Sequence, residues 1–299
     1  MTEGRSARQA SERIRRAIER MREDLPQLAA IYDAFNDLLA AQAGLKAELP
    51  VISNADLTVD PLEFSQGVPI LTGQAFALSP ENLRKASALL LPALEQGFPK
   101  IKEQLSVIKK AIENKNQDSG HCLTAIGAWA NEEIEKTASN LRVDAGILRF
   151  VLSQLAKPFA QKHAESFTPL PRDLQWHKGY CPICGSWPEL SFLECKEGHR
   201  WLRCSFCGYE WRYPRIKCPF CDSEDQDKLE ILFSEDRKSE RAELCHECMK
   251  YLVSIDLRER ADDVAREAVP LGLVYLDVLA QEKGFSPGAI CGWNIIDES

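Results

Sequence analysis

Four Cys-x-x-Cys pairs crowd the region between residues 181 and 248 and account for eight of the chain's eleven cysteines. The pairs are Cys181/Cys184, Cys204/Cys207, Cys218/Cys221 and Cys245/Cys248. One such pair is weak evidence because redox motifs share it, but four together are typical of metal binding. They predict two sites, each closed by four thiolates about 2.3 Å from a tetrahedral ion. A region this short buries little core, so bound metal and packed aromatic residues are expected to hold it folded.

The order in which the pairs combine is open from the sequence. Consecutive pairing is the default interpretation, and the main alternative joins Cys181/Cys184 with Cys218/Cys221. Gly185 and Gly208 follow the first two pairs, where the turn needs a positive φ that glycine adopts without steric cost. Asp222 and Met249 follow the other two pairs, so the second site is expected to be less regular.

Composition limits the class of protein. The formal net charge is −8 at pH 7, which disfavours a general nucleic-acid binder. No apolar run approaches the ~20 residues of a membrane span, and residues 1–22 are too polar and charged for a secretory signal. Paired spacing, an odd cysteine total and the missing signal favour reduced thiolates in the cytoplasm.

The remaining pattern predicts an α+β multidomain chain. Apolar residues recur at helical spacing through most of residues 1–172, which predicts a helical N-terminal domain. Short strand-like stretches separate the cysteine pairs. We therefore expect a first small rubredoxin-like or zinc-ribbon module over residues 173–214. A second module with a C-terminal helix is expected over residues 215–299.

Several alternatives compete with the two-site interpretation. Zinc ribbons and rubredoxin-like iron centres both use tetrahedral thiolate cages, and spacing alone favours zinc. His246 could replace a cysteine, and Cys195 with His199 could form a competing ligand set. Cys122 and Cys291 are expected to be packing residues. A basic cluster could bind nucleic acid, although acidic residues outnumber basic ones across residues 173–255. The cluster is Arg200, Arg203, Arg212, Arg215 and Lys217.

No phosphate loop, dinucleotide fingerprint or Gly-x-Ser-x-Gly motif is present, and a four-thiolate shell leaves no open position for metal-bound water. The residues therefore disfavour hydrolysis by a metal-bound water.

The residues around the pairs resemble the formate dehydrogenase accessory proteins of the FdhE family. The stretches that carry the resemblance are Cys181–Pro188, Trp201–Cys207 with Glu210 and Trp211, Arg215–Cys221 and Cys245–Leu252. Leu148–Phe159 and Leu276–Gly284 extend it to the rest of the chain.

The resemblance implies a cytoplasmic, non-enzymatic protein with two rubredoxin-like modules that bind iron, with zinc as a substitute. The implied ligands are Cys181, Cys184, Cys204, Cys207, Cys218, Cys221, Cys245 and Cys248. The implied partner is the immature catalytic subunit of a respiratory formate dehydrogenase, before its export with a molybdenum cofactor. A rubredoxin-like electron carrier and a zinc-ribbon nucleic-acid binder are the alternatives, and the chain could form a homodimer.

Overall fold

The computed structural model describes residues 3–52, 59–71, 78–114, 131–168, 170, 174–194, 196–259 and 264–294. The chain divides into two compact units. The helical unit consists of Met1–Asn54 and Leu71–Ser166, and the cysteine unit consists of Ala55–Ile70 and Phe167–Ser299.

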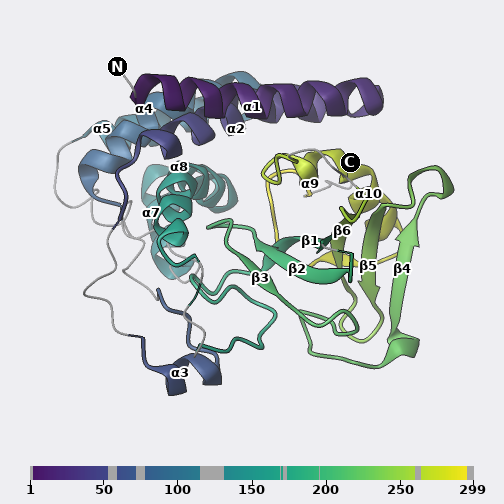
Figure 1. The fold of residues 1–299 in the computed structure, drawn as a ribbon. Helices are drawn as coiled ribbons and strands as arrows, with labels where there is room; N and C mark the ends of the chain where they lie inside the picture. Colours follow the sequence, from purple (N-terminus) through teal and green to yellow (C-terminus); the bar gives the residue numbers. More distant parts are fainter. Residues whose placement is uncertain are drawn as a thin grey trace. The chain divides into compact units, whose positions relative to one another are not determined.

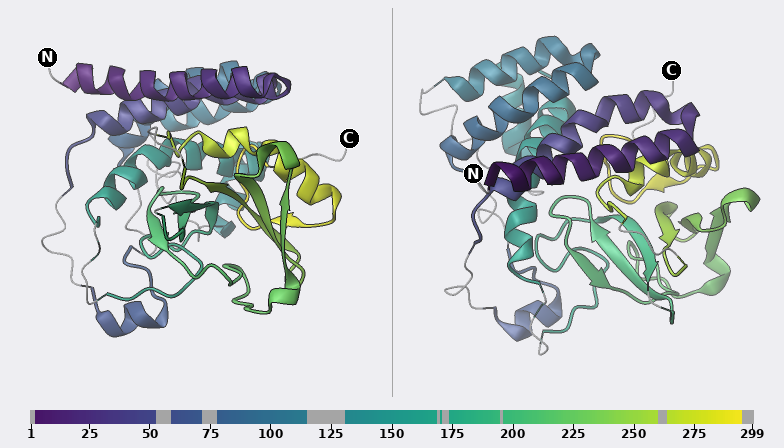
Figure 2. Two further views of the ribbon diagram at one scale, coloured as in Figure 1. Left: turned by 45° about the vertical axis from the view of Figure 1, so that its right-hand side comes forward. Right: turned by 45° about the horizontal axis from the view of Figure 1, so that its top comes forward.

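The helical unit is built from amphipathic helices whose apolar stripes form its core (Figure 1). Its helices are α1 (Glu3–Asp24), α2 (Ala29–Glu48), α4 (Pro80–Gly97), α5 (Lys102–Glu113), α7 (Asn131–Leu141) and α8 (Ala145–Glu165). The chain turns between α1 and α2 through a 3₁₀ turn that starts at Pro26, and α1 and α2 then lie along each other (Figure 2). The hydroxyl of Ser79 accepts a hydrogen bond from the backbone N–H of Asn82, which caps α4 ahead of Pro80.

Packing inside this unit follows the predicted stripes. Leu105, Ile108 and Ile112 of α5 are buried, as are Leu148, Val151, Leu152 and Leu155 of α8. The ring of Phe98 lies edge-on to Phe35 and Phe150, with ring centroids 5.0 and 5.2 Å apart. Residues 115–130 lie outside the described part of the chain, so the helical spacing predicted there stays a prediction.

The cysteine unit is organised by one sheet in which both cysteine-rich halves take part. Its strands are β1 (Pro188–Glu194), β2 (His199–Cys204), β3 (Glu210–Arg212), β4 (Leu229–Phe233), β5 (Glu240–Cys245), β6 (Lys250–Asp256) and β7 (Ser286–Pro287). The spatial order is β3-β2-β1-β6-β5-β4, and β7 pairs with β6. Neighbours within β1–β3 and within β4–β6 are antiparallel, whereas β7 runs parallel to β6.

Parallel pairing of β1 with β6 joins the two halves, with Ser191 opposite Ser254 and Leu193 opposite Asp256. The first cysteine pair precedes β1, and the second lies where β2 turns into β3; the third pair precedes β4, and the fourth lies where β5 turns into β6. The predicted domains 1–172, 173–214 and 215–299 stay predictions. The predicted class, a helical N-terminal part followed by a sheet that carries two cysteine clusters, is confirmed.

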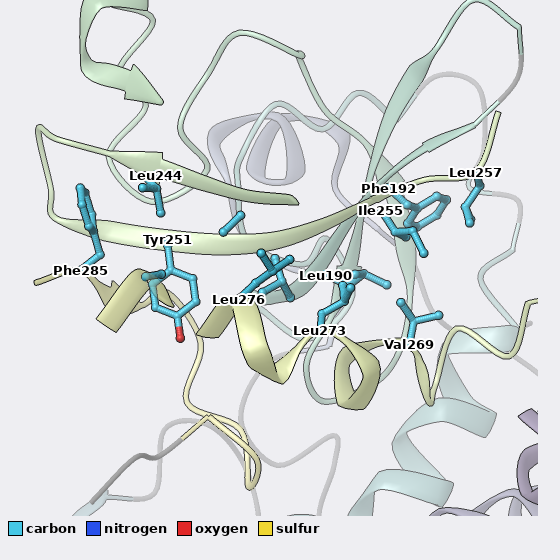
Figure 3. Packing of buried hydrophobic residues seen from close by; sticks show 13 residues of the cluster. Leu190, Phe192, Leu244, Tyr251, Ile255, Leu257, Val269, Leu273, Leu276 and Phe285 are labelled. Carbon is cyan, nitrogen blue, oxygen red and sulfur yellow. The ribbon is translucent and has the colours of Figure 1, made fainter. Parts of the chain in front are cut away.

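The core of the cysteine unit lies on one face of this sheet, under α9 (Val269–Gly272) and α10 (Val274–Glu282). Figure 3 shows Val269 of α9, Leu276 of α10 and Leu273 between these helices packed toward Leu190 of β1 and Ile255 of β6. Because side chains alternate along a strand, the opposite face carries the neighbouring residues, including Ser191, Arg241, Glu243 and Ser254. That face forms part of a cavity lined by Arg241, Glu243 and Ser254. Within the described residues, no helix combines the length and apolar character needed to cross a bilayer.

Candidate metal centres

Eight cysteines converge in two groups of four. In the first group the Sγ atoms of Cys181 and Cys207 are 3.5 Å apart and those of Cys184 and Cys204 are 3.4 Å apart. In the second group Cys218 lies 3.7 Å from Cys248, and Cys221 lies 3.6 Å from Cys245. The first two Cys-x-x-Cys pairs therefore form one group and the last two form the other, which is the consecutive arrangement.

The sulfur separations fit a tetrahedral thiolate site. Sulfurs about 2.3 Å from a tetrahedral ion lie roughly 3.8 Å from one another, close to the separations within each group. A disulfide would require about 2.05 Å, and all eight are free thiols. Soft thiolate donors in this geometry suit zinc or iron, so each group could bind such a metal.

The backbone of each pair turns back toward its own sulfur. Ile183, Phe206 and Phe220 donate backbone N–H groups to Cys181, Cys204 and Cys218, each over 3.4 Å. Such donors favour the charged thiolate form that binds metal.

The residue after each pair has positive φ, at 75° for Gly185, 64° for Gly208, 61° for Asp222 and 54° for Met249. Asp222 and Met249 thus adopt the same turn as the glycines, and the expected irregularity does not extend to the backbone. The Asp222 carboxylate accepts a hydrogen bond from Tyr213 over 3.0 Å and pairs with Lys217 over 3.3 Å, which anchors this turn.

Burial distinguishes the two groups. All four cysteines of the first group are buried, whereas Cys221 is exposed and Cys248 is half-buried in the second. Burial raises the pKa of the Cys181 and Cys207 thiols well above the ordinary value. It raises the pKa of Cys248 to about 11. A metal ion must displace the protons that these thiols hold, so metal affinity will rise with pH.

A distant segment of the chain packs beside the first group. Helix α3 (Pro61–Gln66) buries Phe64, whose ring lies 4.7 Å from that of Trp176. The hydroxyl of Tyr180 donates a hydrogen bond to the Gly67 carbonyl over 2.7 Å. The Ile70 N–H donates to the Pro182 carbonyl over 2.9 Å, directly inside the first Cys-x-x-Cys turn. No local pattern in the sequence predicts this contact.

Two members of the predicted basic cluster have structural roles. Arg200 is buried and donates to the Pro214 and Lys217 carbonyls over 2.8 and 2.9 Å, and it pairs with Glu243. Arg203 is buried and donates to the Gly208 carbonyl over 3.0 Å, which steadies the second cysteine turn. These contacts remove two of the five cations from any nucleic-acid surface.

The other candidate ligands lie apart from both groups or outside the described residues. The His246 ring forms a hydrogen bond with Glu230 over 2.8 Å and meets Phe285 edge-on. Cys291 is buried, as expected for a packing residue, and its sulfur lies 4.0 Å from Glu189. Cys122 and Cys195 fall outside the described residues, so the proposed set of Cys195 with His199 stays a prediction.

Comparisons with known proteins agree with these features. The family model for the FdhE central domain matches residues 180–215. An FdhE homolog from Aquifex aeolicus is 28% identical over 272 residues, which cover 89% of this chain and 88% of that protein. An FdhE homolog from Haemophilus influenzae (strain PittGG) is 37% identical over 110 residues, 36% of this chain and 35% of that protein. The FdhE protein of Escherichia coli O127:H6 is 34% identical over 114 residues, 37% of this chain and 36% of that protein.

The crystal structure of the FdhE protein from Pseudomonas aeruginosa has the same fold. It matches with a TM-score of 0.55 and 22% identity, over 94% of this chain and 92% of that one. The four cysteine pairs, the match of residues 180–215 to the central-domain model and the relatives together show that the chain is similar to proteins of the FdhE family over most of its length.

Proposed function

We propose that this chain is an accessory protein in formate dehydrogenase maturation. It binds the immature catalytic subunit of a respiratory formate dehydrogenase in the cytoplasm and carries out no catalysis itself. The similarity to FdhE proteins supports the accessory role. The observation that carries the proposal is the pair of four-sulfur groups, because closed thiolate shells stabilise a folded surface but offer no position to a substrate.

The eight paired cysteines are the proposed ligands, and iron is the proposed ion, with zinc as a substitute. When bound, iron would add reversible one-electron chemistry to a site that otherwise only stabilises the fold. The chain's own contribution is to hold four sulfurs at tetrahedral spacing and to direct N–H groups at them. Metal analysis and the absorption spectrum of protein isolated without oxygen distinguish iron from zinc.

Co-purification of the catalytic subunit from anaerobically grown native cells tests the partner. Tagged wild-type chain is expected to enrich the subunit, and a Cys181→Ser, Cys184→Ser variant is expected to lose it. Cys291→Ser is the matched control, because this buried cysteine belongs to neither group. A Cys221→Ser variant adds an exposed position at which misfolding is a smaller risk. Equal recovery with wild-type and cysteine-pair variants would contradict the proposal.

Exposure of the second group favours one further candidate, a rubredoxin-like electron carrier. Electron exchange needs close approach to the centre, and exposed Cys221 and half-buried Cys248 leave one side of it open. This candidate predicts a reversible reduction of the isolated protein. A colourless protein that contains only zinc would exclude it.

A further inference from the structure

A cavity of about 520 Å³ lies on the sheet face opposite α9 and α10. Its walls are formed by the loop of residues 215–220 and by strands β4, β5 and β6. Leu229, Ile231 and Leu252 contribute apolar lining from the strands. Cys218 and Cys245 also lie in the wall, so the cavity borders the second cysteine group.

The mouth of this cavity exposes large apolar side chains. Ile216 is 52% exposed and Ile231 is 49% exposed, and both line the cavity. Phe233, two residues beyond Ile231 and therefore on the same face of β4, is 42% exposed. Gathered exposed apolar side chains of this size are typical of an interaction site.

Strand β4 also offers an open edge. It ends the sheet, and within the described residues it pairs only with β5 (Figure 1). Natural edge strands are commonly protected by lysine, proline or a bulge. The one charged residue of β4, Glu230, already pairs with His246 and Lys283 over 2.8 and 3.1 Å. An extended peptide could therefore add to β4 and place alternate side chains over the cavity.

The charged side chains that line the cavity indicate the charge of the segment that it binds. Arg200 pairs with Glu243, Lys217 with Asp222 and Glu224, and Arg241 with Asp256. Two cations remain without a carboxylate among the described residues. Arg215 is exposed, and the Lys250 ammonium lies 5.9 and 5.7 Å from the ring centroids of Trp187 and Phe220. Both carboxylates in the wall, Glu230 and Glu243, are paired, so the unmatched charge is positive.

We propose that this cavity, the β4 groove, binds an extended acidic segment of the catalytic subunit as an added strand on β4. Apolar side chains of the segment cover Ile216 and Ile231, and its carboxylates pair with Arg215 and Lys250. The identity of the partner rests on the proposed function, whereas the groove and its charge rest on the residues above. Because Cys218 and Cys245 form part of the wall, loss of metal from the second group is expected to weaken binding as well.

Affinity of the full-length, metal-loaded chain for the purified catalytic subunit tests the proposal. Ile231→Glu is expected to weaken binding about tenfold or more, because it places a charge at the apolar mouth. Arg215→Glu is expected to weaken it about fivefold to tenfold, with a smaller effect at high salt. The controls are Ile290→Glu, at a 77% exposed isoleucine, and Arg212→Glu, at an exposed arginine, both outside the cavity lining. Each control is expected to bind within about twofold of wild type.

Hydrogen exchange on the same complex tests the geometry, because an added strand protects those amides of residues 229–233 that do not already bond to β5. Wild-type affinity in both groove variants, or unchanged exchange in β4, would overturn the proposal and leave the proposed function standing. Tighter binding by Arg215→Glu would show a basic occupant and also overturn it. If Ile231→Glu abolished self-association but not subunit binding, the groove would belong to a second copy of this chain. Failure of wild-type chain to bind the subunit would instead contradict the proposed function, and this assignment with it.

Discussion

Arg200 of β2 and Glu243 of β5 form an ion pair across the two halves of the cysteine unit. Ser191 of β1 completes the contact, because its hydroxyl accepts from Arg200 Nε over 3.1 Å and donates to Glu243 over 2.9 Å. Arg200 also holds two carbonyls of the chain that leads into the third cysteine pair. This one guanidinium thus connects both cysteine-rich halves.

Removal of the carboxylate should therefore destabilise the cysteine unit as a whole. In Glu243→Gln the buried Arg200 charge loses its partner, which is expected to lower the free energy of unfolding by about 3 kcal/mol. Chemical denaturation of the metal-loaded protein measures this loss. Glu235→Gln breaks an exposed ion pair with Lys238 and serves as the control, with little change expected. Equal stability of the two variants would show that the Arg200 contact does not join the halves.

The difference in burial between the two cysteine groups predicts an order of thiol reactivity. In metal-loaded protein, N-ethylmaleimide is expected to label Cys221 first and Cys248 next among the eight paired cysteines, because the other six are buried. The four cysteines of the first group should react last. A time course read by mass spectrometry gives the order, and denatured, chelator-treated protein is the control in which all eight react. Early labelling of Cys181 or Cys204 would contradict the burial seen in the structure.

Packing of α3 against the first group depends on a glycine. Gly67 has φ of 106°, and a Cβ there would lie 2.5 Å from the Tyr180 hydroxyl, which itself donates to the Gly67 carbonyl. Gly67→Ala should cost about 1–2 kcal/mol in backbone strain and break this hydrogen bond in addition. Thermal unfolding, together with faster exchange of the Ile70 amide, would report the change.

Gly284→Ala provides a matched control, because φ is 89° and nothing lies within 4 Å of its Cβ position. This variant has the same unfavourable backbone conformation but no steric clash, so it should be less destabilising than Gly67→Ala. A larger effect at Gly284 than at Gly67 would argue against the α3 contact.

Asp277 gives the stability of the cysteine unit a distinct pH dependence. Burial raises the pKa of this carboxyl from 3.8 to about 7, although the Tyr251 hydroxyl, 2.7 Å away, acts in the opposite direction. The unfolded chain therefore loses this proton near pH 4 while the folded chain keeps it to about pH 7. Between these values the folded state is stabilised most at low pH, and its stability falls as the pH rises, by at most about 1.4 kcal/mol per pH unit.

The variant Asp277→Asn removes this proton and keeps a group that accepts from Tyr251. Relative to wild type, it is expected to be more stable at pH 8 than at pH 5. Urea denaturation of both proteins at the two pH values isolates the contribution, because all other titrating groups are shared. A difference between the proteins that does not change with pH would contradict the raised pKa.

The sequence by itself determined the features that depend on local spacing. Two residues between cysteines place both sulfurs on one turn, so the eight candidate ligands and the expectation of two four-sulfur groups followed from the sequence. Which pairs combine was decided only by the structure. Stripes such as Leu105, Ile108 and Ile112 identified the helical core, because the helical period places them on one side. The motifs around the cysteines also indicated the family.

Only the tertiary structure decided the features that depend on contacts between distant residues. Parallel pairing of β1 with β6 merges two expected modules into one sheet, and no local pattern encodes that pairing. Arg200 is a candidate surface cation in the sequence, but in the folded chain it is buried and forms internal contacts. Cys221 is exposed, although the seven other paired cysteines lie in the same motif. Burial depends on which segments pack together in the folded chain, and spacing within any one segment does not specify that.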